Sequence, residues 1–248
     1  MINKRLFLLG GYDLEMVEIR KILIKKSEVF YDNKLEWGAK LSDYKKFFDD
    51  EHDFAGIELT KDIKPPKSYI EIDHHNEKNS LPSSIEQIAD MLGIELDRWQ
   101  KLVAVNDKGY IPAMEAMGAT KEEIDKIRKE DRKAQGVTET DEMSALKSIQ
   151  EQLTVVRGVT MVKSLTPRFS AVTDRLYPYS KLLIYNDRAM TYYGVNAGKM
   201  KEVFNELIIS GVAYSGGGPS GFFGIKKDAL SLESLSEIIN KITCIINS

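Results

Sequence analysis

The chain of 248 residues has little cysteine, no long apolar run and no excess of positive charge. Its one cysteine, Cys244, cannot form an internal disulfide, which indicates a reducing, cytoplasmic compartment. No apolar run approaches the ~20 residues of a membrane helix, and the run at 6–11 is too short for the core of a signal peptide. The net charge of −3 excludes a global basic field for nucleic acid, although a local basic channel stays open.

The composition is that of a soluble globular protein, with 42% hydrophobic and 29% charged residues. This apolar content offsets the entropy that the chain loses on folding, so disorder is excluded as the dominant state. A length of 248 residues fits two small domains or one large domain. The sequence has neither an internal repeat nor a low-complexity tract.

Strand-like and helix-like segments alternate along the first third of the chain. The apolar run Leu6–Leu9 stops at two glycines, as a buried parallel strand does. The other strands expected here are 29–31, 54–59 and 69–72, and the expected helices are 13–25 and 37–48. This alternation predicts an open α/β sheet.

The segment 83–135 is predicted to be helical. Capping boxes at 83–86 and 120–123 mark two helix starts, because each side chain there satisfies a backbone donor. A break is expected at 106–109, where Asn-Asp-Lys-Gly interrupts the helical pattern.

A change of composition at 136–141 marks the expected hinge between two domains. Thr138 and Asp141 have the spacing that caps a connecting helix. Beyond it, strands are expected at 159–162, 182–185 and 190–195, and helices at 170–176, 197–209 and 232–246. We therefore predict an α/β domain, a helical linker and a smaller α/β C-terminal domain, at 1–135, 136–155 and 156–248.

Asp73, His74 and His75 directly follow the expected strand 69–72 and form the strongest chemical signal. In an open parallel sheet, ligands bind beyond the carboxyl ends of the strands. A carboxylate and two imidazoles can ligate a divalent transition metal, and two of the chain's three histidines are adjacent here. Taken alone, the two histidines also fit loop residues that cap a backbone carbonyl.

Four carboxylates stand at comparable positions near the expected strand ends and the helix break: Asp13, Glu15, Glu58 and Asp107. Several carboxylates around one crevice repel one another unless cations neutralise them. A pair of Mn²⁺ or Mg²⁺ ions about 3.5–4 Å apart activates water and stabilises the leaving oxygen in phosphodiester cleavage. Individually, Asp13 also fits a helix cap and Glu58 a surface charge.

The segment 214–224 contains three consecutive glycines, Gly216–Gly218. Glycine permits close backbone approach and positive φ, and consecutive amides can form a concave site for an anion. A phosphate or carboxylate of a substrate fits such a site. A simple chain reversal explains the glycines equally well.

The motif at 73–75, the pair Asp13 and Glu15 upstream, and the glycine run together resemble the DHH phosphoesterase superfamily. That superfamily includes RecJ-type exonucleases, nanoRNases and cyclic-dinucleotide phosphodiesterases. The resemblance covers nearly the whole chain and implies an α/β DHH domain, a connecting helix and a smaller DHH-associated domain. It also implies a binuclear, usually manganese, site in a cleft between the domains, which hydrolyses phosphodiester or phosphoanhydride bonds.

Carried onto this sequence, the resemblance implies that seven residues hold the metal ions: Asp13, Glu15, Glu58, Asp73, His74, His75 and Asp107. His74 or His75 would also act in catalysis, by stabilising charge or supplying a proton. The substrate's phosphate or terminal group would be held by four residues of the glycine-rich segment: Gly216, Gly217, Gly218 and Ser220.

Several positions depart from the family pattern, among them the following three. Glu15 and Glu58 stand where the family has aspartates, and Pro219 follows the glycine run in place of a histidine. Two alternatives therefore stand beside the enzyme. One is a non-catalytic relative that binds a nucleotide or phosphate, and the other is a metal-dependent hydrolase of non-phosphate bonds.

The acidic balance disfavours a processive nuclease on long DNA, which needs a basic channel. We expect a small phosphorylated compound, a cyclic dinucleotide or a short oligonucleotide as the substrate, and no membrane partner. A homodimer stays open, because the apolar pairs 208–209 and 222–223 fit either the core or an interface.

Overall fold

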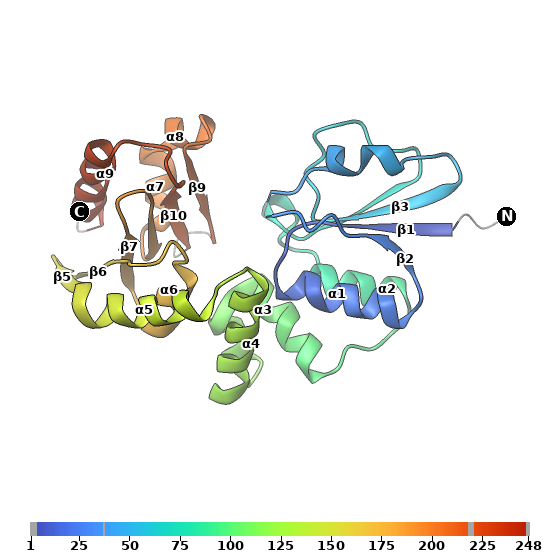
Figure 1. The fold of residues 1–248 in the computed structure, drawn as a ribbon, viewed down its shortest axis with the longest axis horizontal. Coiled ribbons are helices and arrows are strands. Elements are labelled where there is room, and N and C mark those ends of the chain that lie inside the picture. The colour runs from blue at the N-terminus through green and yellow to red at the C-terminus, as the bar shows by residue number, and fades with distance from the viewer. Residues whose placement is uncertain (1–3, 37, 218–220, 247–248) are drawn as a thin grey trace. The chain divides into compact units, whose positions relative to one another are not determined.

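The computed structural model describes residues 4–36, 38–217 and 221–246, which divide into two compact units. The first unit ends at Gly136 and the second begins at Val137. Each unit contains a β-sheet flanked by helices (Figure 1), so the predicted α/β fold class is confirmed. Within the described ranges, no helix is both long and apolar enough to cross a membrane.

Four parallel strands form the sheet of the first unit, in the order β2-β1-β3-β4. The strands are β1 Lys4–Leu9, β2 Val29–Tyr31, β3 His52–Ile57 and β4 Tyr69–Ile72. In the register, Leu6 pairs with Val29 on one side and with Phe54 on the other, so β1 is an inner strand. Because the strands are parallel, their carboxyl ends share one edge of the sheet.

Successive residues of β1 point to opposite faces of this sheet, and both faces are covered. On one face, Phe7 and Leu9 pack with helices α1 (Leu14–Lys25) and α2 (Ser84–Met91). On the other face, Leu6 and Leu8 pack with the 3₁₀ helix η1 (Leu41–Phe47). Figure 1 shows α1 and α2 on one side of the strands and the lighter blue helix η1 on the other.

Three more helical segments complete the first unit: η2 Asn76–Lys78, α3 Arg98–Ala116 and α4 Lys121–Ala134. Both capping boxes predicted for this region are present. The break predicted at 106–109 is present but falls slightly later, because the helical backbone is interrupted at Gly109 and at Tyr110, which has a φ of 59°. Asp107 therefore lies within a helix rather than in a loop.

The second unit has a mixed six-stranded sheet in the order β5-β6-β7-β8-β10-β9. Only β6 and β7 are parallel, and the other neighbours are antiparallel. The strands are β5 Leu153–Val156, β6 Val159–Lys163, β7 Lys181–Tyr185, β8 Met190–Gly194, β9 Ala213–Gly216 and β10 Phe222–Ile225.

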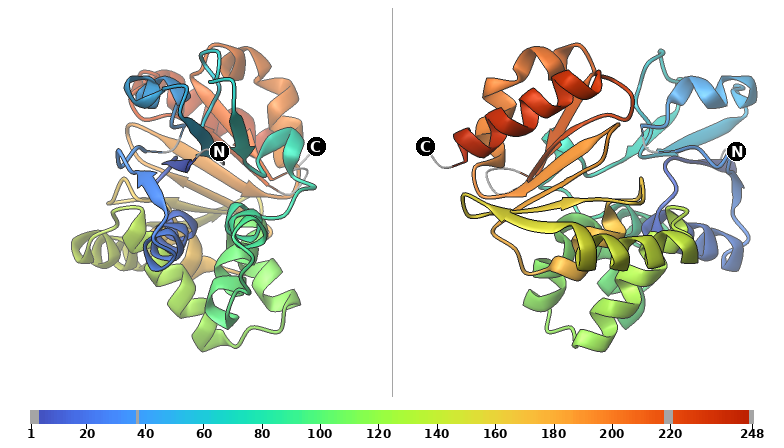
Figure 2. Two further views of the ribbon diagram at one scale, coloured as in Figure 1. Left: turned by 90° about the vertical axis from the view of Figure 1, so that its right-hand side faces the viewer. Right: turned by 60° about the vertical axis from the view of Figure 1, so that its left-hand side comes forward.

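Helices cover both faces of the second sheet (Figure 2). On one face, Tyr192 and Phe223 pack with Met200 and Ile239 from α7 and α9. On the other face, Leu182 packs with residues of α5 and α6. The helices of this unit are α5 Glu139–Gln152, α6 Ser170–Leu176, α7 Ala197–Val203, α8 Asn205–Ile209 and α9 Leu232–Ile245.

Some predicted elements differ from the structure. The helix expected at 37–48 is the shorter 3₁₀ helix η1, while Trp37 lies outside the described residues. The helix expected at 197–209 is two helices, because Phe204 takes a non-helical backbone with a φ of −112°. The predicted linker 136–155 includes the start of an unpredicted strand, β5, whose β-branched residues favour extended backbone.

Candidate metal centre

Three of the predicted site segments lie at the carboxyl edge of the first sheet. Asp13 follows β1 after a short loop, Glu58 directly follows β3, and Asp73 directly follows β4. Because these strands are parallel neighbours, the loops that follow them meet at one edge. The fourth segment carries Asp107 and comes from helix α3.

The backbone is tightly packed where β1 and β3 end. A Cβ atom on Gly10 would lie 2.3 Å from the carbonyl oxygen of Ile57, so only glycine fits there without a shift of backbone. Glu58 takes a left-handed φ of 53°, and its N–H donates to the carbonyl oxygen of Ile72 at 2.8 Å. This conformation costs roughly 1–2 kcal/mol for a residue with a Cβ. This left-handed backbone of Glu58 ends strand β3 at the residue whose carboxylate belongs to the site.

His74 lies at the centre of a cluster of acidic groups and is 4% exposed. Its Nε2 atom lies 2.6 Å from Asp107 Oδ2 and 3.6 Å from both Glu58 Oε1 and Glu15 Oε2. One potential ligand atom from each of Glu58, His74, His75 and Asp107 lies within 4.8 Å of the others. The two imidazole rings have centroids 4.4 Å apart. The structure thus brings five of the predicted site residues together.

The start of helix α2 holds two of the carboxylates. The backbone N–H of Ile85 donates to Glu15 Oε1 at 3.0 Å, and the hydroxyl of Ser84 donates to Glu58 Oε1 at 2.8 Å. The partial positive charge of a helix N-terminus stabilises carboxylates placed beside it. The sequence predicts this helix start from its capping box, but it does not predict that the helix fixes Glu15 and Glu58.

Among the residues that the structure describes, three buried atoms of the cluster have no hydrogen-bond partner: Glu15 Oε2, His74 Nε2 and Asp107 Oδ2. The short separation of His74 Nε2 and Asp107 Oδ2 is therefore not a well-aligned hydrogen bond. Buried polar atoms are nearly always paired, and an unpaired one costs about 1–3 kcal/mol. Two carboxylate oxygens and an imidazole nitrogen that converge without a well-aligned hydrogen bond fit a bound cation as their common partner.

Burial and mutual repulsion raise the pKa values of the carboxyl groups. The pKa of Asp13 is raised to about 7, by desolvation and then by the negative charge of Asp107. The same two causes raise the pKa of Glu15 well above its usual range. The pKa of Glu58 is also well above its usual range, through desolvation and the charge of Glu15. Desolvation lowers the pKa of His74, but the adjoining Asp107 carboxylate outweighs it and raises the pKa.

Asp73 contacts His75 and Lys78 rather than joining the group of four ligand atoms. Its Oδ1 lies 3.0 Å from His75 Nδ1, and its Oδ2 accepts from Lys78 Nζ at 3.1 Å. Burial raises the pKa of Asp73, but these two partners outweigh it and hold the pKa far below its usual value. The hydrogen bond to Asp73 also raises the pKa of His75. A carboxylate on Nδ1 leaves Nε2 of His75 available as a ligand.

Asp13 has a divided role. Its Oδ1 accepts from the Met16 N–H at 2.8 Å and caps helix α1, as one reading of the sequence expects. Its charge also interacts with Asp107 and His75, so it lies beside the cluster. One side chain thus serves as both the cap and a neighbour of the candidate metal site.

The residues present fit a divalent cation. Two ligands of one octahedral ion, each at about 2.1 Å, lie about 3 Å apart. The separations of 2.6 and 3.6 Å around His74 Nε2 fall on either side of this value. Mixed carboxylate and imidazole donors suit Mn²⁺, and carboxylates alone also suit Mg²⁺.

The described ends of the glycine-rich segment belong to the antiparallel pair β9 and β10 of the second unit. Gly217 has a φ of 73°, and a Cβ on Gly221 would lie 1.9 Å from the carbonyl oxygen of Gly216, so both positions require glycine. This antiparallel pairing agrees with the simple chain reversal left open above. Of the predicted substrate contacts, Gly218 and Ser220 lie outside the described residues.

No protein-family model matches the sequence, and no curated protein matches it. Several solved structures do match the fold. The DHH domain of a member of the s1p family of ribosomal proteins has a TM-score of 0.51 and 11% identity, over 99% of this chain and 87% of that one. RecJ from Thermus thermophilus in complex with Mn²⁺ has a TM-score of 0.52 and 10% identity, over 98% of this chain and 52% of that one. The chain thus spans about half the length of that RecJ.

The pGpG-specific phosphodiesterase PggH from Vibrio cholerae also matches, with a TM-score of 0.49 and 11% identity, over 100% of this chain and 99% of that one. The likeness to the s1p-family structure and to RecJ shows that this chain has the fold of a DHH domain. The fold that the resemblance implies is therefore confirmed. At such low identity, any inference about activity depends on the residues of the site itself.

Proposed function

We propose that this protein is a metal-dependent phosphoesterase that hydrolyses phosphodiester or phosphoanhydride bonds in a small nucleotide or a short oligonucleotide. One observation carries the proposal. Unpaired, buried atoms of Glu15, His74 and Asp107 converge at the carboxyl edge of a parallel sheet, where ligands bind in open α/β folds.

In this proposal, two Mn²⁺ ions, or Mg²⁺ in their place, are held by five side chains: Asp13, Glu15, Glu58, His74 and Asp107. Two such ions, when bound, make a water molecule nucleophilic near neutral pH and stabilise the leaving oxygen. The N-terminus of α2 keeps the Glu15 and Glu58 carboxylates oriented, through Ile85 and Ser84. Asp73 fixes the ring of His75 through Nδ1.

His75 is the proposed proton donor to the leaving oxygen. Its side chain is 43% exposed, unlike that of His74, so a substrate in solvent can reach it. Its hydrogen bond to Asp73 raises its pKa, and an imidazole that carries a proton can donate it to a leaving oxygen. Gly216, Gly217, Gly218 and Ser220 remain the proposed contacts for a phosphate or terminal group of the substrate.

The net charge of −3 supports a short substrate, because long DNA would require a continuous basic channel. A dinucleotide or short oligonucleotide has few phosphates, so its binding does not require a long row of basic side chains. The proposal therefore excludes processive degradation of long strands as the main activity.

The test is hydrolysis of bis-p-nitrophenyl phosphate and of a short oligonucleotide, with Mn²⁺ and with EDTA. We expect Mn²⁺-dependent turnover that falls at least about 100-fold in His74→Ala. His52→Ala is the matched control, because His52 is the remaining histidine and contacts Asp49 at 2.9 Å rather than the cluster. Turnover that persists in EDTA or in folded His74→Ala would refute the proposal. Bound Mn²⁺ without turnover on any phosphodiester would instead favour the non-catalytic nucleotide-binding relative.

A further inference from the structure

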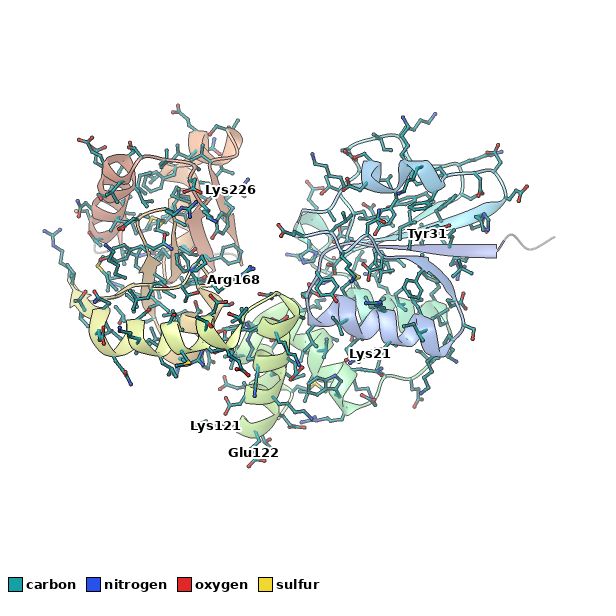
Figure 3. All side chains as sticks on the ribbon, in the orientation of Figure 1. Lys21, Tyr31, Lys121, Glu122, Arg168 and Lys226 are labelled. Atoms are coloured by element: carbon teal, nitrogen blue, oxygen red, sulfur yellow. The ribbon has the colours of Figure 1, made fainter. Side chains whose placement is uncertain are left out.

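Helix α4 carries a buried ion pair that touches two of the segments that supply the candidate metal site. Arg128 Nη1 donates to Asp131 Oδ2 at 2.7 Å, and the two residues are 7% and 5% exposed. The N-terminal end of the same helix is different, because Lys121 and Glu122 point away from the protein (Figure 3). A buried pair of charges is costly unless further hydrogen bonds satisfy it, so its partners are informative.

Asp131 holds the segment that carries Asp13 and Glu15. Its Oδ1 accepts the backbone N–H of Leu14 at 3.2 Å, and Leu14 lies between those two carboxylates. This N–H is at the start of helix α1, where backbone donors have no partner within the helix. The side chain of a distant helix therefore fixes the point from which two predicted ligands project.

Arg128 holds the segment that carries Asp107. Its Nη1 also donates to Asn106 Oδ1 at 3.0 Å, and Asn106 precedes Asp107 in the chain and is 7% exposed. The guanidinium carbon lies 4.6 Å from the ring centroid of Tyr110, the residue with positive φ at the kink of α3. Arg128 thus contacts helix α3 on both sides of Asp107.

We infer that Arg128 and Asp131 are positioning residues for the metal site, which link the start of α1 to the kink of α3 through one buried ion pair. The inference rests on the metal centre of the proposed function. Residues that orient metal ligands typically contribute 10–100-fold to metal affinity. A planar guanidinium suits this role because its fixed donors can hold a carboxylate and an amide oxygen together.

The test is the dissociation constant for Mn²⁺, measured by calorimetry on the full chain. Asp131→Asn and Arg128→Lys should each weaken Mn²⁺ binding by about 10–100-fold. The matched control is the exposed pair Arg98 and Glu123, which also joins α3 to α4, at 3.0 Å. Glu123→Gln should leave the dissociation constant within about twofold of the wild type.

A double variant keeps the test decisive if a single variant fails to fold. Arg128→Met with Asp131→Leu removes both charges together, and such apolar replacements of buried ion pairs often preserve the fold. Near-UV circular dichroism and the melting temperature without metal report on folding. Folded variants that bind Mn²⁺ as tightly as the wild type would overturn the inference and assign the pair a purely structural role.

The same measurement separates this inference from the proposed activity. Wild-type protein that binds Mn²⁺ but hydrolyses no phosphodiester refutes the activity, and the variants still decide the positioning role. Wild-type protein that binds no Mn²⁺ refutes the metal centre and the positioning role together.

Discussion

Replacing Asp13 with Asn removes one negative charge from the cluster and keeps the helix cap. Asp13 Oδ1 accepts the Met16 N–H at 2.8 Å, and Asn caps helices about as well as Asp does. The substitution therefore isolates the electrostatic cost of an ionised carboxylate in the metal-free site. We expect it to stabilise the metal-free protein at pH 8.

The magnitude follows from the pKa of Asp13, which is about 7 in the folded chain. An unperturbed Asp has a pKa of about 3.9, and the difference of about 3 units corresponds to about 4 kcal/mol. Because the folded pKa is the higher one, the folded state binds more protons between about pH 4 and pH 7, and stability falls as pH rises through this window. Because neighbouring carboxyl groups titrate together with Asp13, the single substitution should raise the free energy of unfolding by about 1–3 kcal/mol at pH 8.

The assay is urea denaturation in EDTA at pH 8 and pH 5. Asp13→Asn should be more stable than the wild type at pH 8, and the difference should shrink by more than half at pH 5. Asp97→Asn is the control, because Asp97 caps α3 in the same way, through the Gln100 N–H at 2.9 Å, but lies on the surface. A metal-free Asp13→Asn protein that is less stable than the wild type at pH 8 would refute the reasoning.

Three further substitutions test separate parts of the structure. Gly10→Ala places a Cβ 2.3 Å from the Ile57 carbonyl oxygen and should lower the free energy of unfolding by about 1–3 kcal/mol, measured by urea denaturation; an unchanged midpoint would contradict the packing. Glu58→Asp withdraws the carboxylate from the Ser84 hydroxyl and should weaken Mn²⁺ binding about 10-fold in calorimetry; equal affinity would remove Glu58 from the site. Thr138→Ala removes the cap of α5 and should lower the free energy of unfolding by about 1 kcal/mol, measured by thermal denaturation. The affinity for Mn²⁺ should stay unchanged, and a weaker affinity would contradict this prediction.

The strands of the first unit could be predicted because their signals are local. The apolar run 6–9 stops at two glycines, and the structure has β1 there. Capping boxes at 83–86 and 120–123 likewise correspond to real helix starts. In such segments, the periodicity of apolar side chains and the capping residues both favour one backbone conformation.

Other elements carried weaker local signals. Strand β5 is an exposed edge strand, so no alternation of buried and exposed residues marks it in the sequence. Strands β9 and β10 flank the glycine run, where glycine and aromatic residues obscure the alternation. The two helices at 197–209 are separated by a backbone change at Phe204 that side-chain periodicity does not reveal.

The members of the site could be predicted better than their roles. Glu58 and His74 come together because parallel strands end at one edge, which the order of elements already implies. Asp73 has the same location, yet it bonds to Lys78 and His75, and local hydrogen bonds of this kind depend on rotamers. The buried pair on α4 had no signal in the sequence, because residues 121–133 have the pattern of a solvated, highly charged helix.

Titration of the full chain with Mn²⁺, followed by electron paramagnetic resonance, tests the central claim most directly. The wild type and His52→Ala should bind Mn²⁺ saturably and alike, whereas folded His74→Ala should bind at least about 100-fold more weakly, because His74 lies among Glu15, Glu58 and Asp107. Saturable binding that is unchanged in His74→Ala, or no binding by the wild type, would contradict the assignment of this cluster as a metal centre.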